Sequence, residues 1–361
     1  MPTPPPHSPT LHPPTRPLES GPATDLPGGS PVGTAAEPGA VVDPVAHSTG
    51  PGRSADEERG GRPAAAAALL AYVLLLATCF SWAGNSIAGR MAAGEISPMV
   101  LTTLRWATAM LIAWPFARAH LKRDAALLRA HWRRLALLGF TGFTLFNVLL
   151  YSALARTTAV NVVLVQAAMP AFIFALGFLA FRTRVVAAQV AGFAMSVVGV
   201  SLVVLGGGGE GLGGIGAGEA LITIGVVVYA VYTLMLSRKP PVHWLSAIAV
   251  MGGFALLASL PFAAWEVARG IDAWPNAPRG WGLVLFTAVF PSLVAQVCFM
   301  RGVDLIGPNR AGLFVNLVPV MGTLMAVALL GEPFGARHAL ALALALGGVT
   351  LAEWGARRAA G

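Results

Sequence analysis

The chain has 361 residues, of which 56% are hydrophobic and only 11% are charged, and its formal net charge is +8. A mean hydropathy of +0.70 excludes an ordinary soluble domain and indicates a membrane protein. The positive charge would also suit a nucleic-acid-binding protein, but most basic residues lie in short segments between apolar runs, as they do in membrane proteins. We therefore expect a lipid bilayer as a partner and no nucleic acid.

Residues 1–62 differ from the rest of the chain because Pro, Gly, Ser and Thr dominate and long apolar side chains are scarce. Such a composition buries too little surface to offset the entropy lost on folding, so we expect a disordered tail. The segment also lacks the apolar core of a secretory signal peptide. We interpret it as an extension without function, or as the product of a misplaced start codon, rather than as a partner-binding segment.

From Ala64 onward the chain contains ten apolar segments, each long enough to cross a bilayer as a helix that rises about 1.5 Å per residue. The second opens at Ser97-Pro98, which is a favourable helix start. A glycine-rich stretch, 206–218, separates the first five segments from the last five. The expected spans are 66–88, 97–117, 134–155, 158–181, 185–205, 217–236, 243–265, 281–301, 310–330 and 336–354.

The last five segments repeat the first five at a constant offset of 149 residues. Pro170 lies in the middle of the fourth segment, and Pro319 falls opposite it in the ninth. A proline is tolerated there because neighbouring helices in a membrane can satisfy the freed carbonyl group. Identities at the same offset include Leu164 with Leu313, Gly199 with Gly348, Val200 with Val349 and Leu202 with Leu351. The sequence thus predicts two five-helix repeats, 64–205 and 217–355.

The orientation of the spans follows from the distribution of Lys and Arg. If the N-terminus lies in the cytoplasm, the internal loops hold 14 basic residues and the external loops hold 5. Both termini are therefore expected in the cytoplasm. Because each repeat has an odd number of spans, the two copies must enter the membrane in opposite directions. Inverted repeats of this kind are typical of secondary transporters, whose site lies near the midplane between the halves.

Several stretches resemble a known family. Residues 80–106, FSWAGNSIAGRMAAGEISPMVLTTLRW, resemble the opening of an EamA-type domain. The runs 153–181 and 302–333 resemble the fourth and ninth helices of that family, and the second ends in Gly-Glu-Pro at 331–333. The first copy has Thr183 where the second has Glu332. The resemblance covers about residues 70–354 and implies a ten-helix carrier of the bacterial inner membrane from the drug/metabolite transporter superfamily, many of whose members export amino acids and related metabolites.

Arg105 is the one charged residue well inside a predicted span, about two helical turns from Pro98. Charged residues in such positions are functional candidates, although Arg105 could instead snorkel outward or pair with Glu95. Glu332 lies at a helix end, where it could bind a proton or a cationic group, cap a helix, or pair with Arg337, and we favour a structural role. No Asp, Glu or His lies at the predicted midplane, so the coupling ion stays open, with the proton as one option.

Uncharged polar residues are the main candidates for a substrate site. Asn147 and Tyr151 are four residues apart and share a helix face, and Gln296 matches Asn147 at the repeat offset. We expect a central cavity between the first, third, fourth, sixth, eighth and ninth spans, with apolar walls and a few polar groups that orient a neutral or zwitterionic solute. The alternative is hydrogen bonding between helices. The candidate substrate-binding residues are Asn147, Tyr151, Gln166, Tyr232, Gln296, Asn316, Trp82 and Asn85, and the candidate hinges are Pro170 and Pro319.

Gln166 and Asn316 come from equivalent spans but are one residue out of register at the repeat offset. One residue corresponds to about 100° around a helix. One of the two side chains could therefore face lipid or a packing seam instead of the cavity.

No enzyme motif stands out, because HExxH, CxxC, GxSxG and a P-loop with its lysine are all missing from the sequence. Cys79 and Cys298 fall inside spans as small apolar residues, so we expect no disulfide, metal or cofactor. The sequence favours a secondary transporter of amino-acid-like or drug-like solutes of low net charge, and the resemblance implies export. An uptake permease or channel-like facilitator of the same fold and, with less support, an intramembrane enzyme remain as alternatives, and the oligomeric state is left open.

Overall fold

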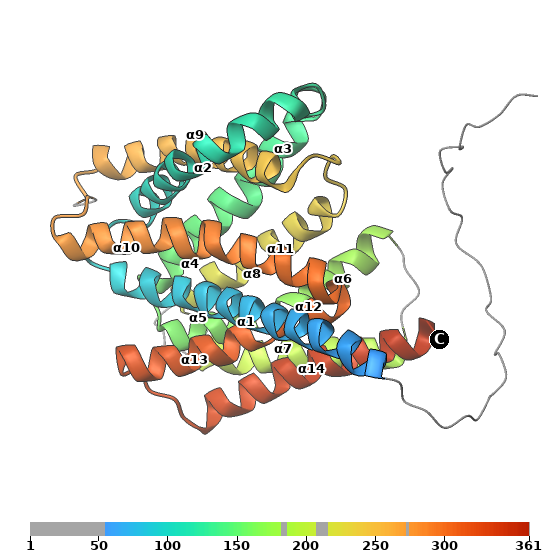
Figure 1. Ribbon diagram of the computed structural model, residues 1–361. Coiled ribbons are helices and arrows are strands. Elements are labelled where there is room, and N and C mark those ends of the chain that lie inside the picture. Colours follow the sequence, from blue (N-terminus) through green and yellow to red (C-terminus); the bar gives the residue numbers. More distant parts are fainter. Residues whose placement is uncertain (1–54, 182–185, 207–215, 272–273, 361) are drawn as a thin grey trace, which may run out of the picture. The chain divides into compact units, whose positions relative to one another are not determined.

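The computed structural model describes residues 55–181, 186–206, 216–271 and 274–360. Within these ranges every element of regular secondary structure is a helix (Figure 1). Ten helical stretches are long and apolar enough to cross a membrane, which confirms the predicted all-α fold with ten spans. In chain order, spans 1 to 10 are Ala67–Ala92, Pro98–Ala130, Trp132–Leu154, Ala159–Ala180, Ala187–Leu205, Ala217–Leu236, Trp244–Ala268, Pro278–Ile306, Arg310–Leu330 and Ala336–Gly355.

Six of these spans are single helices, and four are divided into successive helical elements. The single helices are α1 (Ala55–Ala92), α2 (Pro98–Ala130), α7 (Ala187–Leu205), α8 (Ala217–Leu236), α9 (Trp244–Ala268) and α14 (Ala336–Ala360). The divided spans are α3 (Trp132–Leu138), η1 (Gly139–Leu145) and α4 (Phe146–Leu154); α5 (Ala159–Gln166) and α6 (Met169–Phe181); α10 (Pro278–Val289), η3 (Phe290–Val294) and α11 (Ala295–Ile306); and α12 (Pro308–Val315) and α13 (Leu317–Leu330).

Two helices extend beyond the predicted spans. α1 begins at Ala55, so the end of the stretch 1–62, which we expected to be a disordered tail, is helical. α2 continues to Ala130 through residues expected to form a loop, because the Ala, Leu, Lys and Arg residues there are strong helix formers. The rest of the expected tail lies outside the described residues.

The packing of the helices is preserved when the two repeats are exchanged. α7 packs along α14 and α2 packs along α9, so spans 5 and 10 are neighbours, and so are spans 2 and 7 (Figure 1). In the first repeat, α1 packs against α11 and α13, which belong to spans 8 and 9. In the second repeat, α8 packs against α4 and α6, which belong to spans 3 and 4. Span 1 of each repeat is thus inserted between the third and fourth spans of the other.

Equivalent helices run in opposite directions. A Cβ atom built on Gly192 of α7 would lie 2.3 Å from the carbonyl oxygen of Gly348, and one on Gly199 would lie 2.8 Å from the carbonyl oxygen of Ala341. Moving forward along α7 therefore means moving backward along α14. Glycine is required at such contacts because no side chain fits between two backbones this close. The antiparallel course of the equivalent spans 5 and 10 is what an inverted repeat requires.

A second antiparallel pair, α2 and α9, repeats this relationship. The Thr103 hydroxyl donates to the Ser259 hydroxyl at 2.9 Å. Four residues earlier, the backbone N–H of Met99 donates to the Glu266 carboxylate at 3.1 Å. The later residue of α9 thus pairs with the earlier residue of α2, so equivalent spans 2 and 7 are also antiparallel.

The two π-helical elements occupy equivalent places in the repeats. Shifting η1 by 149 residues gives 288–294, which contains the whole of η3. A π-helix holds one extra residue per turn, and such turns are frequent at functional sites. Both elements lie in spans that line the central cavity described below.

The two predicted hinge prolines follow breaks in their spans. Pro170 is the second residue of α6, and Pro319 is the third residue of α13. Each proline therefore lies in the first turn of a helix, where its missing N–H would have no partner within that helix. This explains locally why both spans tolerate a proline near their centre.

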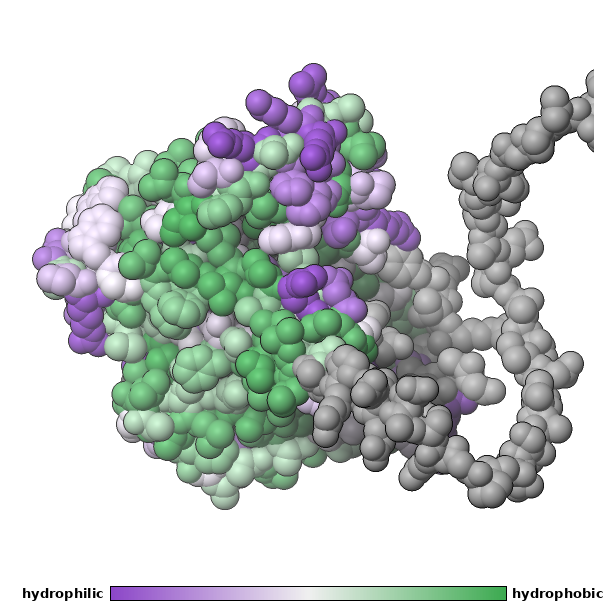
Figure 2. All heavy atoms as spheres, viewed as in Figure 1, coloured by the Kyte–Doolittle hydropathy of each residue, from purple (hydrophilic) through white to green (hydrophobic). Residues whose placement is uncertain are grey.

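Large apolar side chains cover the outside of the bundle. Leu111, Phe116, Leu179, Leu324 and Leu329 are all more than half exposed. Figure 2 shows hydrophobic residues across the middle of the molecule and hydrophilic residues at the left edge and at the top, around the connection between α2 and α3. This distribution fits helices whose sides contact lipid and whose ends reach the membrane surfaces.

Candidate functional site

A cavity of about 390 Å³ lies between the two repeats. Its wall includes residues from spans 1, 3, 4, 6, 8 and 9, the six spans expected to form it, together with residues from spans 2 and 10. The volume falls within the range of sites for small organic ligands. Of the predicted site and hinge residues, those in the wall are Trp82, Asn85, Asn147, Gln166, Tyr232, Gln296, Asn316, Pro170 and Pro319.

Arg105 lies at the cavity and not at the membrane surface. It is only 5% exposed, and it donates four hydrogen bonds to neighbouring side chains. Nε bonds to the Ser292 hydroxyl at 2.7 Å. Nη1 contacts Asn147 Oδ1 and the Tyr151 hydroxyl, both at 2.7 Å, and Asn85 Oδ1 at 3.1 Å. These four partners come from α1, α4 and η3, so Arg105 joins three other spans to α2.

The two alternatives considered for Arg105 do not describe its position. Its burial shows that the side chain does not snorkel outward. Glu95 instead forms an ion pair with Arg279, at 3.9 Å. The sequence located Arg105 along α2 but did not show that this face of α2 turns toward the cavity. Trp106, the next residue, also lines the cavity.

The partners of Arg105 are themselves held by further hydrogen bonds. The side-chain nitrogen of Asn147 donates to the Phe143 carbonyl at 2.7 Å, which directs the amide oxygen of Asn147 toward Arg105. The Ser292 hydroxyl donates to the Thr287 carbonyl at 2.8 Å. Phe143 belongs to η1 and Ser292 to η3, so the matched π-helical elements support both sides of this polar cluster. Sequence reasoning missed Ser292, although Pro291 beside it could have indicated an irregular span.

Tyr151 takes a different place from the one expected. Its side chain is almost fully buried, and its hydroxyl donates to Asn85 Oδ1 at 2.9 Å while accepting from Arg105. It therefore supports the polar cluster from behind the cavity wall. The four-residue spacing did place Asn147 and Tyr151 together, since both bond to Arg105 Nη1.

Both out-of-register amides, Gln166 and Asn316, line the cavity. The helix break before each proline changes the local twist, so the angle expected from a continuous helix does not apply. Gln166 makes long contacts with Ser86 Oγ at 3.5 Å and the Val162 carbonyl at 3.4 Å. Within the described part of the chain, the side chains of Asn316 and Gln296 have no hydrogen-bond partner, so both amides are free to meet a solute.

Aromatic rings form much of the remaining wall. Trp106 stacks on Phe143 with ring centroids 4.5 Å apart. Tyr229 packs against Phe146 at 4.7 Å and Tyr232 at 5.2 Å. The cavity thus joins one polar corner around Arg105 to an apolar surface that suits a flat or branched hydrocarbon group.

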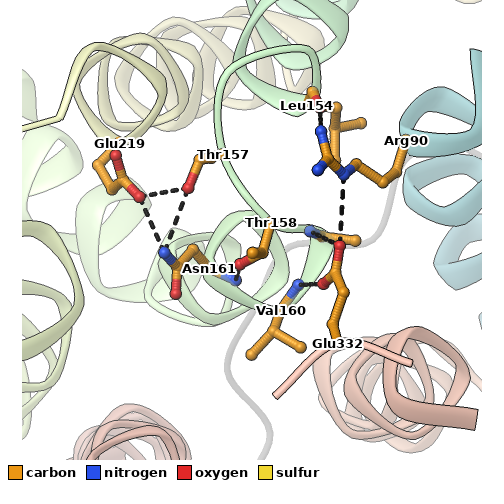
Figure 3. Close-up of polar contacts among 9 residues, drawn as sticks. Arg90, Leu154, Thr157, Thr158, Val160, Asn161, Glu219 and Glu332 are labelled. Carbon is orange, nitrogen blue, oxygen red and sulfur yellow. Dashed lines mark hydrogen bonds and ion pairs between the residues drawn. The ribbon is translucent and has the colours of Figure 1, made fainter. Parts of the chain in front are cut away.

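Glu332 lies away from this cavity, at the start of α5 (Figure 3). Its two carboxylate oxygens accept hydrogen bonds from the backbone N–H groups of Ala159 at 2.9 Å and Val160 at 2.8 Å. It also forms an ion pair with Arg90 at 3.4 Å and not with Arg337. The structural role favoured from the sequence matches this geometry, but the capped helix belongs to the other repeat.

A second carboxylate holds the same helix start from α8. Glu219 accepts hydrogen bonds from Asn161 Nδ2 at 2.8 Å and from the Thr157 hydroxyl (Figure 3). Both Glu219 and Glu332 are largely buried. Glu219 and Glu332 contact the segment 157–161, and Arg90 pairs with Glu332; we call these three residues and this segment the α5 clamp. Glu219 precedes the cavity residue Tyr229 by ten residues, or about 15 Å along α8, so the clamp lies to one side of the cavity along the helix axis.

Ten spans, antiparallel equivalent helices and a partly polar cavity between the repeats define a multi-pass membrane protein with the architecture of a carrier. The profile of the EamA-like transporter family matches this chain twice, over residues 69–205 and 216–354. The chain therefore belongs to the EamA-like transporter family, which confirms the resemblance seen in the sequence.

Individual relatives carry names of the same kind. The uncharacterized transporter YetK of Bacillus subtilis is 27% identical over 284 residues, covering 77% of this chain and 85% of YetK. The uncharacterized transporter YyaM of the same organism is 27% identical over 293 residues, covering 78% and 93%. A solved protein crystal structure aligns with a TM-score of 0.53 at 23% identity, over 81% of this chain and 98% of that one, and supports the fold alone.

Proposed function

We propose that this transporter is a secondary carrier that moves a small organic solute of low net charge by alternating access. The observation that carries the proposal is the cavity between the repeats, with the α5 clamp on one side of it. The clamp joins α5 of the first repeat to α8 and Glu332 of the second. Solute access from that side therefore requires the repeats to move relative to each other.

Two classes of contact support this mechanism. The clamp consists of a few hydrogen bonds to carboxylates, each worth about 1.5–3 kcal/mol, so a transition can break them if new contacts form elsewhere. By contrast, the glycine contacts between α7 and α14 are contacts between backbones and hold the equivalent spans together throughout. Motion of the inner spans against these outer pairs would expose the cavity to each side in turn.

The direction and the membrane of this transport are part of the proposal. The excess of basic residues in the predicted internal loops supports a cytoplasmic location for both termini. With this orientation the α5 clamp lies on the external side, and the proposal assigns the described conformation to the state that is closed toward the outside. Export across the bacterial cytoplasmic membrane is the direction supported by the family resemblance.

The direct test is counterflow in proteoliposomes. Purified protein is reconstituted and loaded with an unlabelled metabolite extract, and exchange of isotopically labelled metabolites is followed with and without an imposed proton gradient. A carrier gives saturable exchange that is stimulated by solute on the opposite side. Flux that rises linearly with concentration and shows no counterflow would indicate a channel and contradict the proposal.

A cross-linking variant provides the matched control. In a background without Cys79 and Cys298, Glu219→Cys and Asn161→Cys are joined by a short bifunctional thiol reagent. The cross-link should abolish exchange, and a reducible reagent should allow its recovery. The same reagent applied to a variant with only one of the two cysteines should leave the exchange rate of that variant unchanged.

A further inference from the structure

We infer that the solute of the proposed carrier is a monoanion whose carboxylate binds Arg105 and whose apolar body packs on the aromatic wall. The inference deepens the proposed function and rests on it. It replaces the expectation of a neutral or zwitterionic solute, which was based on the amide side chains of the predicted site.

The first step is the unbalanced charge of Arg105. Its guanidinium group is a positively charged donor with no acceptor atom. All four of its hydrogen-bond partners are neutral oxygens, and no described Asp or Glu forms an ion pair with it. A buried charge without a counter-ion is unfavourable, and neutral acceptors reduce that cost without neutralising the charge. An anionic solute would supply the missing charge.

The second step is the availability of donors. The four bonds use Nε and Nη1, and no described residue accepts from the remaining terminal nitrogen, Nη2. Arg105 lines the cavity, so this nitrogen is the free end of a planar group that binds carboxylates well. Gln296 follows the Arg105 partner Ser292 by four residues and also lines the cavity with a free amide. Its NH2 group can donate to the second carboxylate oxygen.

The third step limits the charge of the solute. The described cavity wall contains one cationic side chain, Arg105, and no Asp or Glu. A dianion would leave one charge unpaired, and a cation would meet Arg105 without a counter-ion. The rings of Trp106, Phe143, Phe146 and Tyr229 instead offer a surface for a hydrocarbon or aromatic group. Together these features favour a monocarboxylate with an apolar body.

A purely structural arginine is the competing explanation. Arg105 does connect α2 to three other spans, and that connection alone could account for its burial. If Arg105 has only this structural role, solute affinity does not depend on the charge of the solute. The two explanations therefore differ in one measurable property, which is the preference for a carboxylate over a neutral molecule of the same shape.

The experiment uses matched probes on the full-length protein in lipid nanodiscs. Binding of benzoate, phenylacetate, indole-3-acetate and indole-3-propionate is compared with that of their carboxamides and of phenethylamine, by calorimetry and by thermal stabilisation. We expect at least one carboxylate to bind ten or more times as tightly as its carboxamide. Arg105→Gln should remove this preference, and Arg105→Lys should keep part of it. Arg279→Gln, which alters an exposed ion pair outside the cavity, should keep all of it.

Several results would overturn the inference. These are equal binding of carboxylates and carboxamides, tighter binding of the amine, a preference that survives in Arg105→Gln, or no binding of any carboxylate. If Arg105→Gln fails to fold, the comparison of carboxylates with carboxamides in the wild-type protein and in Arg105→Lys still distinguishes the two explanations. Counterflow separates this inference from the proposed function. If neutral or cationic solutes show saturable exchange that is unaffected in Arg105→Lys, the carboxylate inference is rejected and the carrier proposal stands. If carboxylate binding depends on Arg105 but no solute shows counterflow, the carrier proposal is rejected and the carboxylate site stands.

Discussion

Glu332 and Val160 are 172 residues apart in the chain, yet the Glu332 carboxylate accepts the backbone N–H of Val160 at 2.8 Å. The contact joins the end of α13 to the start of α5 and so links the two repeats. It places a negative charge at a helix N-terminus, where the helix dipole stabilises it. The α5 clamp is therefore favourable locally and also connects the two repeats.

Glu332→Gln should loosen the α5 clamp. Glutamine keeps one acceptor oxygen but places a donor NH2 group against the second backbone N–H and removes the ion pair with Arg90. We expect a loss of about 1.5–3 kcal/mol at this contact, or roughly tenfold or more in the open fraction. The measurement is the rate at which an impermeant reagent labels Thr158→Cys. Glu95→Gln, on a loop near the same end, is the control and should not change that rate.

Glu219 and Asn161 should show direct energetic coupling. Their side chains meet at 2.8 Å in a buried setting, and each single alanine change leaves the other group short of a partner. A double-mutant cycle in denaturant titrations should give a coupling of about 0.5–2 kcal/mol. The pair Glu95 and Arg279, at 3.9 Å and partly exposed, serves as the comparison. Additive effects for Glu219 and Asn161 would contradict the contact.

Gln296→Leu should weaken solute binding with little effect on folding, because no described residue bonds to that side chain. Asn147→Leu should weaken solute binding and also destabilise the fold, since it removes an acceptor of Arg105 and a donor to Phe143. The structure leads us to expect a cost of about 1–3 kcal/mol for Asn147→Leu. Thermal unfolding and membrane levels of both variants, beside their exchange kinetics, provide the comparison.

Pro170→Ala and Pro319→Ala should leave membrane insertion intact and slow exchange several-fold. Alanine restores an N–H at each helix break and so favours a continuous helix across the expected hinge. Pro261→Ala is a matched control, because Pro261 lies inside α9 and is exposed on the outside of the bundle. Unchanged initial rates in both single variants and in the double variant would leave the prolines as packing features only.

Gly192→Ala should destabilise the protein, because its Cβ would lie 2.3 Å from a backbone carbonyl of α14, and a helix backbone cannot move as readily as a flexible side chain. Overpacking of this kind costs about 1–3 kcal/mol. Gly253→Ala is the control, since nothing lies within 4 Å of the added atom and alanine favours the helix. A midpoint of thermal unfolding that is equal in the two variants would argue against the tight contact of α7 with α14.

The number of spans and several of the polar cavity residues could be predicted because apolar length and repeat spacing can be read directly from the sequence. Asn147 and Gln296 were found in this way, through their equivalent positions. The place of Arg105 could not be predicted, since its depth along α2 is readable but the face that α2 turns inward depends on its neighbours. In spans that are apolar all round, periodicity does not identify the inner face.

Two further features depend on contacts far apart in the chain. The role of Glu332 requires the start of α5 to lie beside it, and the spacing of residues in the sequence does not predict that contact. The π-helical elements η1 and η3 each insert one extra residue in a turn, and this insertion cannot be recognised in an apolar run of sequence. The polar cluster around Arg105 was therefore beyond prediction as a unit, although four of its five members, Asn85, Arg105, Asn147 and Tyr151, were candidates individually.

The two carboxylates of the α5 clamp have no acidic counterpart at the equivalent positions of the first repeat. The residues that precede Glu219 and Glu332 by the repeat offset of 149 are Leu70 and Thr183, the second of which lies outside the described residues. For the carrier proposed above, unlike residues at these equivalent positions would give the two access states different resting energies. Unequal resting populations give the two membrane faces different apparent affinities for the same solute, while the final concentration ratio is set only by the driving gradient.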